Sequence, residues 1–124
     1  MLNPLLVFVG GGLGALLRYA AGRAAILAGW APPLATLGVN IVGCFAMGLL
    51  AGWFAVHGSS EGGGTASVKI FLVTGLLGGF TTFSAFGLDT LTLWRTSPAH
   101  AAAYVAASVI VSLLAVFLGF SFTR

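Results

Sequence analysis

The chain has 124 residues, of which 59% are hydrophobic and only 6% are charged. Soluble domains carry about a quarter charged residues, so this composition excludes an ordinary soluble fold and predicts an all-α membrane protein. The formal net charge of +3 comes from five scattered Lys and Arg residues, which excludes the basic stripe that a nucleic-acid-binding surface needs. The single cysteine, Cys44, excludes an intrachain disulfide.

Four apolar stretches follow one another along the chain. Each contains the roughly 20 residues that a helix needs to cross a membrane. We expect transmembrane helices at about 3–27, 34–56, 66–93 and 99–122, so that residues 1–124 form a single transmembrane domain. Two prolines within 29–33 predict a turn. The stretch 57–65, rich in glycine and serine, predicts a polar loop. No basic residue precedes the first apolar stretch, which favours a retained helix over a signal peptide.

The third stretch contains an unusual run at residues 78–83, Gly-Gly-Phe-Thr-Thr-Phe. Glycine and threonine are poor helix formers, so we expect the third helix to be broken there. A break frees backbone carbonyls that lipid cannot satisfy, and carbonyls near Gly78 would outline a cation site. A tightly packed kink, with the threonine hydroxyls bonded back to the helix, explains the same residues equally well.

Polar side chains at membrane depth form a second group of candidates. All of them can donate hydrogen bonds and none carries a negative charge, which favours the passage of a small anion that accepts hydrogen bonds. The group recurs at a four-residue spacing in the fourth stretch, so its members share one helix face there. Hydrogen bonds between helices are the alternative role of each residue taken singly. The group comprises Asn40, Thr82, Ser84, Tyr104, Ser108 and Ser112.

Two aromatic and two charged residues complete the candidates. Phe83 and Phe86 share a helix face, and the positive edge of a phenyl ring can meet an anion, although plain packing is the common role of such rings. Asp89 lies near the end of an apolar stretch, where it either pairs with an arginine or reaches the interface. Arg18 either anchors the first helix at the headgroups or marks an ion entrance.

The positive charges are almost balanced between the two sides of the membrane. With four spans, Lys69 and Arg124 lie on one side, whereas Arg23, Arg95 and the nearby Arg18 lie on the other. The positive-inside rule therefore has little to act on. This balance favours insertion in both orientations and an antiparallel homodimer. A fixed orientation with a weak charge bias is the alternative.

Three motifs together resemble the Fluc fluoride channels, the CrcB-like fluoride exporters. The resemblance covers all four spans in order. The motifs are Gly-Gly-Leu-Gly-Ala-Leu-Leu-Arg-Tyr at 11–19, Thr-Leu-Gly-Val-Asn-Ile-Val-Gly at 36–43 and Gly-Leu-Leu-Gly-Gly-Phe-Thr-Thr-Phe-Ser-Ala-Phe at 75–86.

The resemblance implies passive export of fluoride through two pores of an antiparallel, dual-topology homodimer in the plasma membrane. Fluoride enters acidified cells as the neutral acid and ionises inside, so export would reduce its toxicity. The resemblance also implies a central structural sodium ion, held by the carbonyls of Gly78 and Thr81 of both subunits, and no organic cofactor. Arg18 would match the basic residue at the end of the first helix. The implied fluoride pore comprises Asn40, Phe83, Ser84, Phe86, Tyr104, Ser108 and Ser112.

One departure and three alternatives accompany this interpretation. The family motif often continues Ser-Thr-Phe, whereas Ala85 follows Ser84 here, so one hydroxyl beside the aromatic rings is missing. A small multidrug-resistance transporter also has four helices, but it needs a membrane-embedded carboxylate, which the first stretch lacks. An accessory membrane subunit ranks lower. An enzyme ranks last, because no catalytic motif is present.

Overall fold

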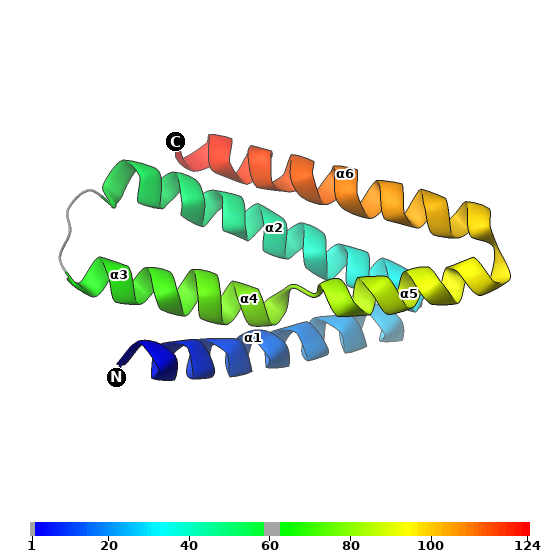
Figure 1. The fold of residues 1–124 in the computed structure, drawn as a ribbon, viewed down its shortest axis with the longest axis horizontal. Coiled ribbons are helices and arrows are strands. Elements are labelled where there is room, and N and C mark those ends of the chain that lie inside the picture. Colours follow the sequence, from blue (N-terminus) through cyan, green and yellow to red (C-terminus); the bar gives the residue numbers. More distant parts are fainter. Residues whose placement is uncertain (1, 59–62) are drawn as a thin grey trace.

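The computed structural model describes residues 2–58 and 63–124 and is built from helices (Figure 1). The first, second and fourth spans are the continuous helices α1 (Leu2–Leu27), α2 (Pro32–His57) and α6 (Pro98–Thr123). The third span consists of α3 (Gly63–Lys69), the π-helix η1 (Ile70–Leu77), α4 (Gly78–Phe80) and α5 (Phe83–Thr96). By length and composition all four spans can cross a membrane. Within the described ranges there is no strand, so the prediction of an all-α, multi-pass membrane protein is confirmed.

The prediction that the prolines form the turn between the first two spans is wrong. Pro32 and Pro33 do not lie in the turn but form the first residues of α2, and Pro98 likewise begins α6. The amides of the first helical turn need no acceptor within the helix, so proline starts a helix without losing a hydrogen bond. The tight turn is made by Gly29, whose φ of 87° suits a residue without a side chain. The polar loop expected over 57–65 is shorter than predicted, because His57 ends α2 and residues 63–65 already belong to α3. Residues 59–62 lie outside the described residues.

The interruption of the third span is shorter than the sequence predicts. Gly78–Phe80 are still helical, and only Thr81 and Thr82 adopt extended backbone angles. The axis of the span bends by 17°, and the span runs on in much the same direction (Figure 1). A break that separates two half-helices therefore stays a prediction. The preceding π-helix was not predicted, because glycine content gives no signal for its wider turn.

Glycine sets the distance between two pairs of spans. A Cβ atom added to Gly10 would lie 2.7 Å from the Phe71 carbonyl oxygen, and one added to Gly14 would collide with the Leu76 carbonyl. These contacts bring α1 directly against the third span. Between α2 and α6, a Cβ atom on Gly48 would collide with the Val116 carbonyl. Such close approach of backbones is how helices associate in lipid.

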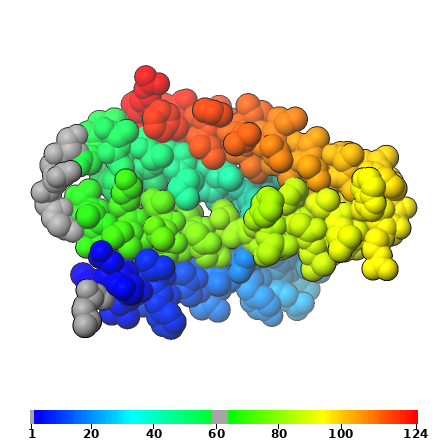
Figure 2. Space-filling view, in the orientation of Figure 1, coloured from blue at the N-terminus to red at the C-terminus, as the bar shows by residue number. Residues whose placement is uncertain are grey.

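The interior of a single chain is thin. Between 11% and 22% of the most apolar part of each span is buried, so most of the surface faces lipid or another chain. Tyr104 and Phe54 are the bulkiest of the buried core side chains, and alanines make up much of the remainder. The start of α1 lies beside α3 and the end of α6 lies beside the end of α2, so that both lie at the same end of the helices (Figure 1 and Figure 2), as four spans require.

Candidate functional site

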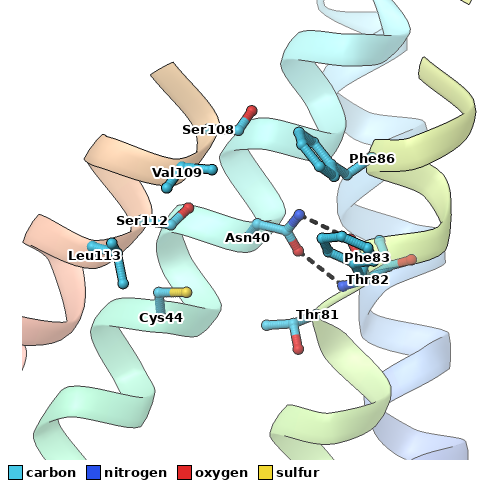
Figure 3. A pocket seen from close by; sticks show the side chains of 10 residues that line it. All are labelled: Asn40, Cys44, Thr81, Thr82, Phe83, Phe86, Ser108, Val109, Ser112 and Leu113. Atoms are coloured by element: carbon cyan, nitrogen blue, oxygen red, sulfur yellow. Dashed lines mark hydrogen bonds between the residues drawn. The ribbon is translucent and has the colours of Figure 1, made fainter. Parts of the chain in front are cut away.

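A cavity of about 330 Å³ lies where α2, the interruption of the third span and α6 meet (Figure 3). Its wall carries amide, hydroxyl and thiol groups together with apolar side chains, and it carries no charged residue. The sequence-based candidates in the wall are Asn40, Thr81, Thr82, Phe83, Phe86, Ser108 and Ser112, and the wall also contains Cys44, Val109 and Leu113. The structure thus gathers most of the predicted polar and aromatic candidates around one space.

Asn40 holds the interruption of the third span in place. Its Nδ2 donates to the carbonyl oxygen of Thr82 at 3.0 Å, and the Thr82 amide donates to its Oδ1 at 2.8 Å. Figure 3 shows both bonds reaching across from α2. The amide side chain therefore replaces the helical partners that Thr82 loses, which is what a polar backbone at this depth needs. The role of a pore amide that the resemblance implies for Asn40 stays a prediction, and the structure shows that the same side chain bonds to the main chain of Thr82.

The threonine hydroxyls complete the local hydrogen bonding. Thr81 Oγ1 donates to the Leu77 carbonyl at 2.9 Å, and this bond returns the side chain to the preceding helix. Thr82 Oγ1 accepts from the Ala85 amide at 3.2 Å and thereby caps the N-terminus of α5. The same oxygen lies 3.3 Å from Ser84 Oγ. Ser84 does not line the cavity, so it supports the cap rather than the wall.

Two backbone carbonyls near the interruption lose their usual partners. In an unbroken helix the Thr82 amide would donate to Gly78 and the Ala85 amide to Thr81. Here the Thr82 amide bonds to Asn40 and the Ala85 amide bonds to the Thr82 hydroxyl. The carbonyl oxygens of Gly78 and Thr81 are therefore left available to another ligand. No cluster of three or more His, Cys, Asp or Glu occurs in the described part of the chain, so a metal there would depend on such backbone oxygens.

The polar residues spaced four apart on α6 reach the cavity. Ser108 and Ser112 both line it. Ser108 is only 7% exposed, and its Oγ is a buried side-chain oxygen without a hydrogen-bond partner among the described residues. Buried hydroxyls nearly always have a partner, and the Ser108 oxygen is itself shielded from solvent in the single chain.

The aromatic rings continue from the cavity toward Asp89. The ring centroids of Phe83 and Phe86 lie 5.3 Å apart, and those of Phe86 and Tyr104 lie 5.5 Å apart. Tyr104 does not line the cavity; its hydroxyl donates to Asp89 Oδ2 at 3.4 Å. The sequence pattern predicts for Asp89 an arginine partner or a place at the interface, and it does not indicate Tyr104. The tyrosine follows it by 15 residues across the α5–α6 turn, a separation that no periodicity links.

Two candidates differ from the others. One lies away from the cavity wall, and the other borders the cavity but is largely exposed. Arg18 belongs to α1, which supplies no residue to the cavity. Phe83 borders the cavity but is 83% exposed in the single chain. A large aromatic side chain so exposed beside a cavity marks a surface that lipid or a second chain would cover.

Comparison with known proteins gives a consistent result. A family model described as "CrcB-like protein, Camphor Resistance (CrcB)" matches residues 5–120. A protein of Paracoccus denitrificans (strain Pd 1222), named "Fluoride-specific ion channel FluC", is 50% identical over 124 residues, which cover 97% of this chain and 93% of that protein. Its namesake from Methylobacterium sp. (strain 4-46) is 45% identical over 125 residues, covering 100% and 98% of the two chains.

Proposed function

This chain belongs to the CrcB-like family, and from that membership we propose that it forms a fluoride-selective channel through which fluoride leaves the cell passively. Its function is therefore transport rather than catalysis. The observation that carries the proposal is the uncharged cavity at membrane depth, in which the buried Ser108 hydroxyl lacks a partner. Such a donor suits a small anion that accepts hydrogen bonds strongly, and the curated relatives bear the name of a fluoride channel.

We further propose that two copies assemble in opposite orientations and form two pores. The cavity is bordered on one side by Phe83, whose ring is 83% exposed in the single chain. A second copy would cover this ring and close the wall. The near balance of Lys and Arg between the two sides supports the opposite orientations. Each pore would then draw aromatic rings from the interface between the copies.

A sodium ion at the dimer axis is part of the same proposal. The carbonyls of Gly78 and Thr81 fit it, because the amides that would engage them in an unbroken helix are bonded to side chains. Unwound carbonyls at a helix end are a recurring sodium ligand in membrane proteins. Two oxygens from one chain cannot surround a cation, so the second copy would supply the matching pair. The ion would hold the two interruptions together without taking part in conduction.

The proposed setting is the plasma membrane. Fluoride that enters as the neutral acid ionises in the cytoplasm, and a passive pore lets it follow its gradient outward. The protein would thereby lower the fluoride burden of the cell.

The experiment that tests the proposal is efflux from liposomes. Purified protein is reconstituted into vesicles loaded with potassium fluoride or potassium chloride, and release is followed with ion-selective electrodes after valinomycin is added. We expect fast, electrogenic release of fluoride and no release of chloride above that of empty vesicles. Equal release of both anions, or no release of either, would contradict the proposal.

A further inference from the structure

One face of α2 carries two cavities end to end. Its residues follow one another at steps of three and four, which places them in a single stripe along the helix. Asn40 and Cys44 line the cavity described above. A second cavity, of about 340 Å³, is lined by Met47, Ala51, Phe54 and Ala55 on α2 and by Lys69 and Val73 on the third span.

The third span meets the two cavities in the reverse order. Lys69 and Val73 line the second cavity and Thr81 lines the first, while the buried Leu77 comes between them. The two helices are antiparallel and border the same two cavities along their length. The seam between α2 and the third span is hollow on either side of Leu77.

The second cavity has a positive charge at its outer end. Lys69 Nζ lies 5.9 Å from the centroid of the Phe54 ring, and this ring is only 9% exposed and belongs to the same cavity wall. The cation–π contact holds the ammonium over the cavity instead of leaving it to extend freely into water. Lys69 precedes Thr81 by 12 residues, or roughly 18 Å of helix, so it lies near the edge of a hydrocarbon core about 30 Å thick.

The described residues contain no carboxylate near this charge. The chain has two acids, Glu61 and Asp89. Glu61 lies outside the described residues, and Asp89 accepts the Tyr104 hydroxyl on α5, beyond the interruption. Among the described lining side chains, the second cavity therefore carries the positive charge of Lys69, whereas the first cavity carries none.

We propose that the second cavity is an anion vestibule in which Lys69 concentrates small inorganic anions, fluoride among them, at the aqueous end of the α2 seam. This inference rests on the proposed function, because it assumes that the seam serves ion passage. A fixed cation in a partly enclosed mouth raises the local anion concentration and hence the rate of entry. The effect must weaken as salt screens the charge.

The test compares fluoride efflux of three variants in liposomes. Lys69→Gln removes the charge with little loss of volume, and Lys69→Arg restores a cation at the same place. Arg124→Gln is the matched control, since Arg124 lies at the same end of the molecule but against the Phe120 ring, outside both cavities. We expect Lys69→Gln to slow efflux about two- to fourfold at 10 mM salt and much less at 1 M salt. Lys69→Arg and Arg124→Gln should match the parent within error.

A second measurement does not depend on how well the charge variant folds. Lys69→Cys is reconstituted and then treated with a methanethiosulfonate that adds either an ammonium or a sulfonate group, and the parent is treated in parallel to report on Cys44. We expect the ammonium adduct to speed efflux and the sulfonate adduct to slow it, relative to the same reagents on the parent.

Each unfavourable result of these experiments would overturn a different proposal. If the parent conducts fluoride but Lys69→Gln has the same rate at both salt concentrations, the vestibule is ruled out and the channel assignment stands. If Lys69→Gln alters only the dependence of efflux on phosphatidylglycerol, Lys69 binds a lipid headgroup and the vestibule is again ruled out. If the parent releases no fluoride, the proposed function fails, and the vestibule fails with it.

Discussion

Asn40 illustrates how one side chain serves both the fold and the candidate pathway. Both ends of its amide are bonded to the main chain of Thr82, and the same residue lines the cavity. An amide is suited to this because it offers a donor and an acceptor at once. A carboxylate would lose the donated bond and bring a negative charge into the cavity, and a serine would be too short to bridge both groups. The position therefore restricts substitution for two separate reasons.

Replacing Asn40 by alanine should destabilise the protein and reduce fluoride efflux. The variant leaves the amide and carbonyl of Thr82 without partners, at a cost of about 1–3 kcal/mol for each group that is not reached by water. Thermal unfolding in detergent and efflux from liposomes measure the two effects. Asn3→Ala, at the exposed start of α1, is the control and should change neither. A variant as stable as the parent would show that the two bonds contribute little.

Phe83 is the residue whose exposure is hardest to explain in a single chain. Replacing it by isoleucine should slow fluoride efflux by about tenfold, or 1.4 kcal/mol in the barrier, because an aliphatic side chain has no positive edge to offer an anion. Cross-linking should still detect the dimer. Phe8→Ile is the matched control, since Phe8 is 78% exposed but lies on α1, away from both cavities. Undiminished efflux in Phe83→Ile would remove this ring from the pathway.

At the scale of secondary-structure elements, the spans form two closely associated pairs. Glycines bring α1 against η1 and α4, and others bring α2 against α6. A hydrogen bond from Thr123 Oγ1 to the Leu49 carbonyl, at 2.8 Å, adds to the second pair. The cavity lies where the interruption of the third span faces α2 and α6. The shape of the site thus depends on how closely backbones approach at residues that do not line it.

Two glycines of α1 provide a direct test of this arrangement. A Cβ atom on Gly14 would collide with the Leu76 carbonyl, whereas one on Gly12 would meet nothing within 4 Å. Gly14→Ala should therefore destabilise the protein by about 1–3 kcal/mol through overpacking. Gly12→Ala should stabilise it slightly, because alanine favours the helix over glycine by about 1 kcal/mol. Thermal unfolding of the two variants under the same conditions decides the matter, and equal melting temperatures would contradict the close contact.

At the scale of the whole molecule, a single chain has little interior and many exposed apolar side chains. Lipid can cover most of them, but it offers no partner to the polar groups around the interruption. The single chain cannot supply such a partner either, because its described helices contain one such interruption. A second copy related by a two-fold axis in the membrane plane would bring two interruptions together, and this is the arrangement that the charge balance permits.

Opposite orientations predict a specific labelling pattern. Single cysteines are introduced by Ser121→Cys near the end of α6 and by Thr96→Cys at the end of α5, each in a chain carrying Cys44→Ala. A membrane-impermeant maleimide applied to intact cells should label about half of the chains at either position, because each end of the molecule faces both sides in the population. Neither substitution alters a charge, so the orientation bias is left as it was. Full labelling at one position and none at the other would establish a fixed orientation.

The number of spans and their helical nature followed from composition, because a chain with so few charges can satisfy its backbone in lipid only by forming helices. Local signals also placed the irregular part of the third span at the right threonines, Thr81 and Thr82. They overestimated its length, since Gly78–Phe80 remain helical. They could not identify the π-helix η1, because local composition gives no signal for its wider turn.

The candidate site, like the fold, was predictable from the sequence only in part. Serine spacing on α6 and the position of Asn40 inside a span were visible along the chain, since both depend on helix periodicity or local polarity alone. The bonds between Asn40 and Thr82 join residues 42 apart, and the bond between Tyr104 and Asp89 crosses a turn. The sequence by itself therefore determined the class of protein and the chemistry available to it. Only the tertiary structure decided which groups satisfy one another and which, like the Ser108 hydroxyl and the Lys69 ammonium, are left facing a cavity, because that depends on which helices lie side by side.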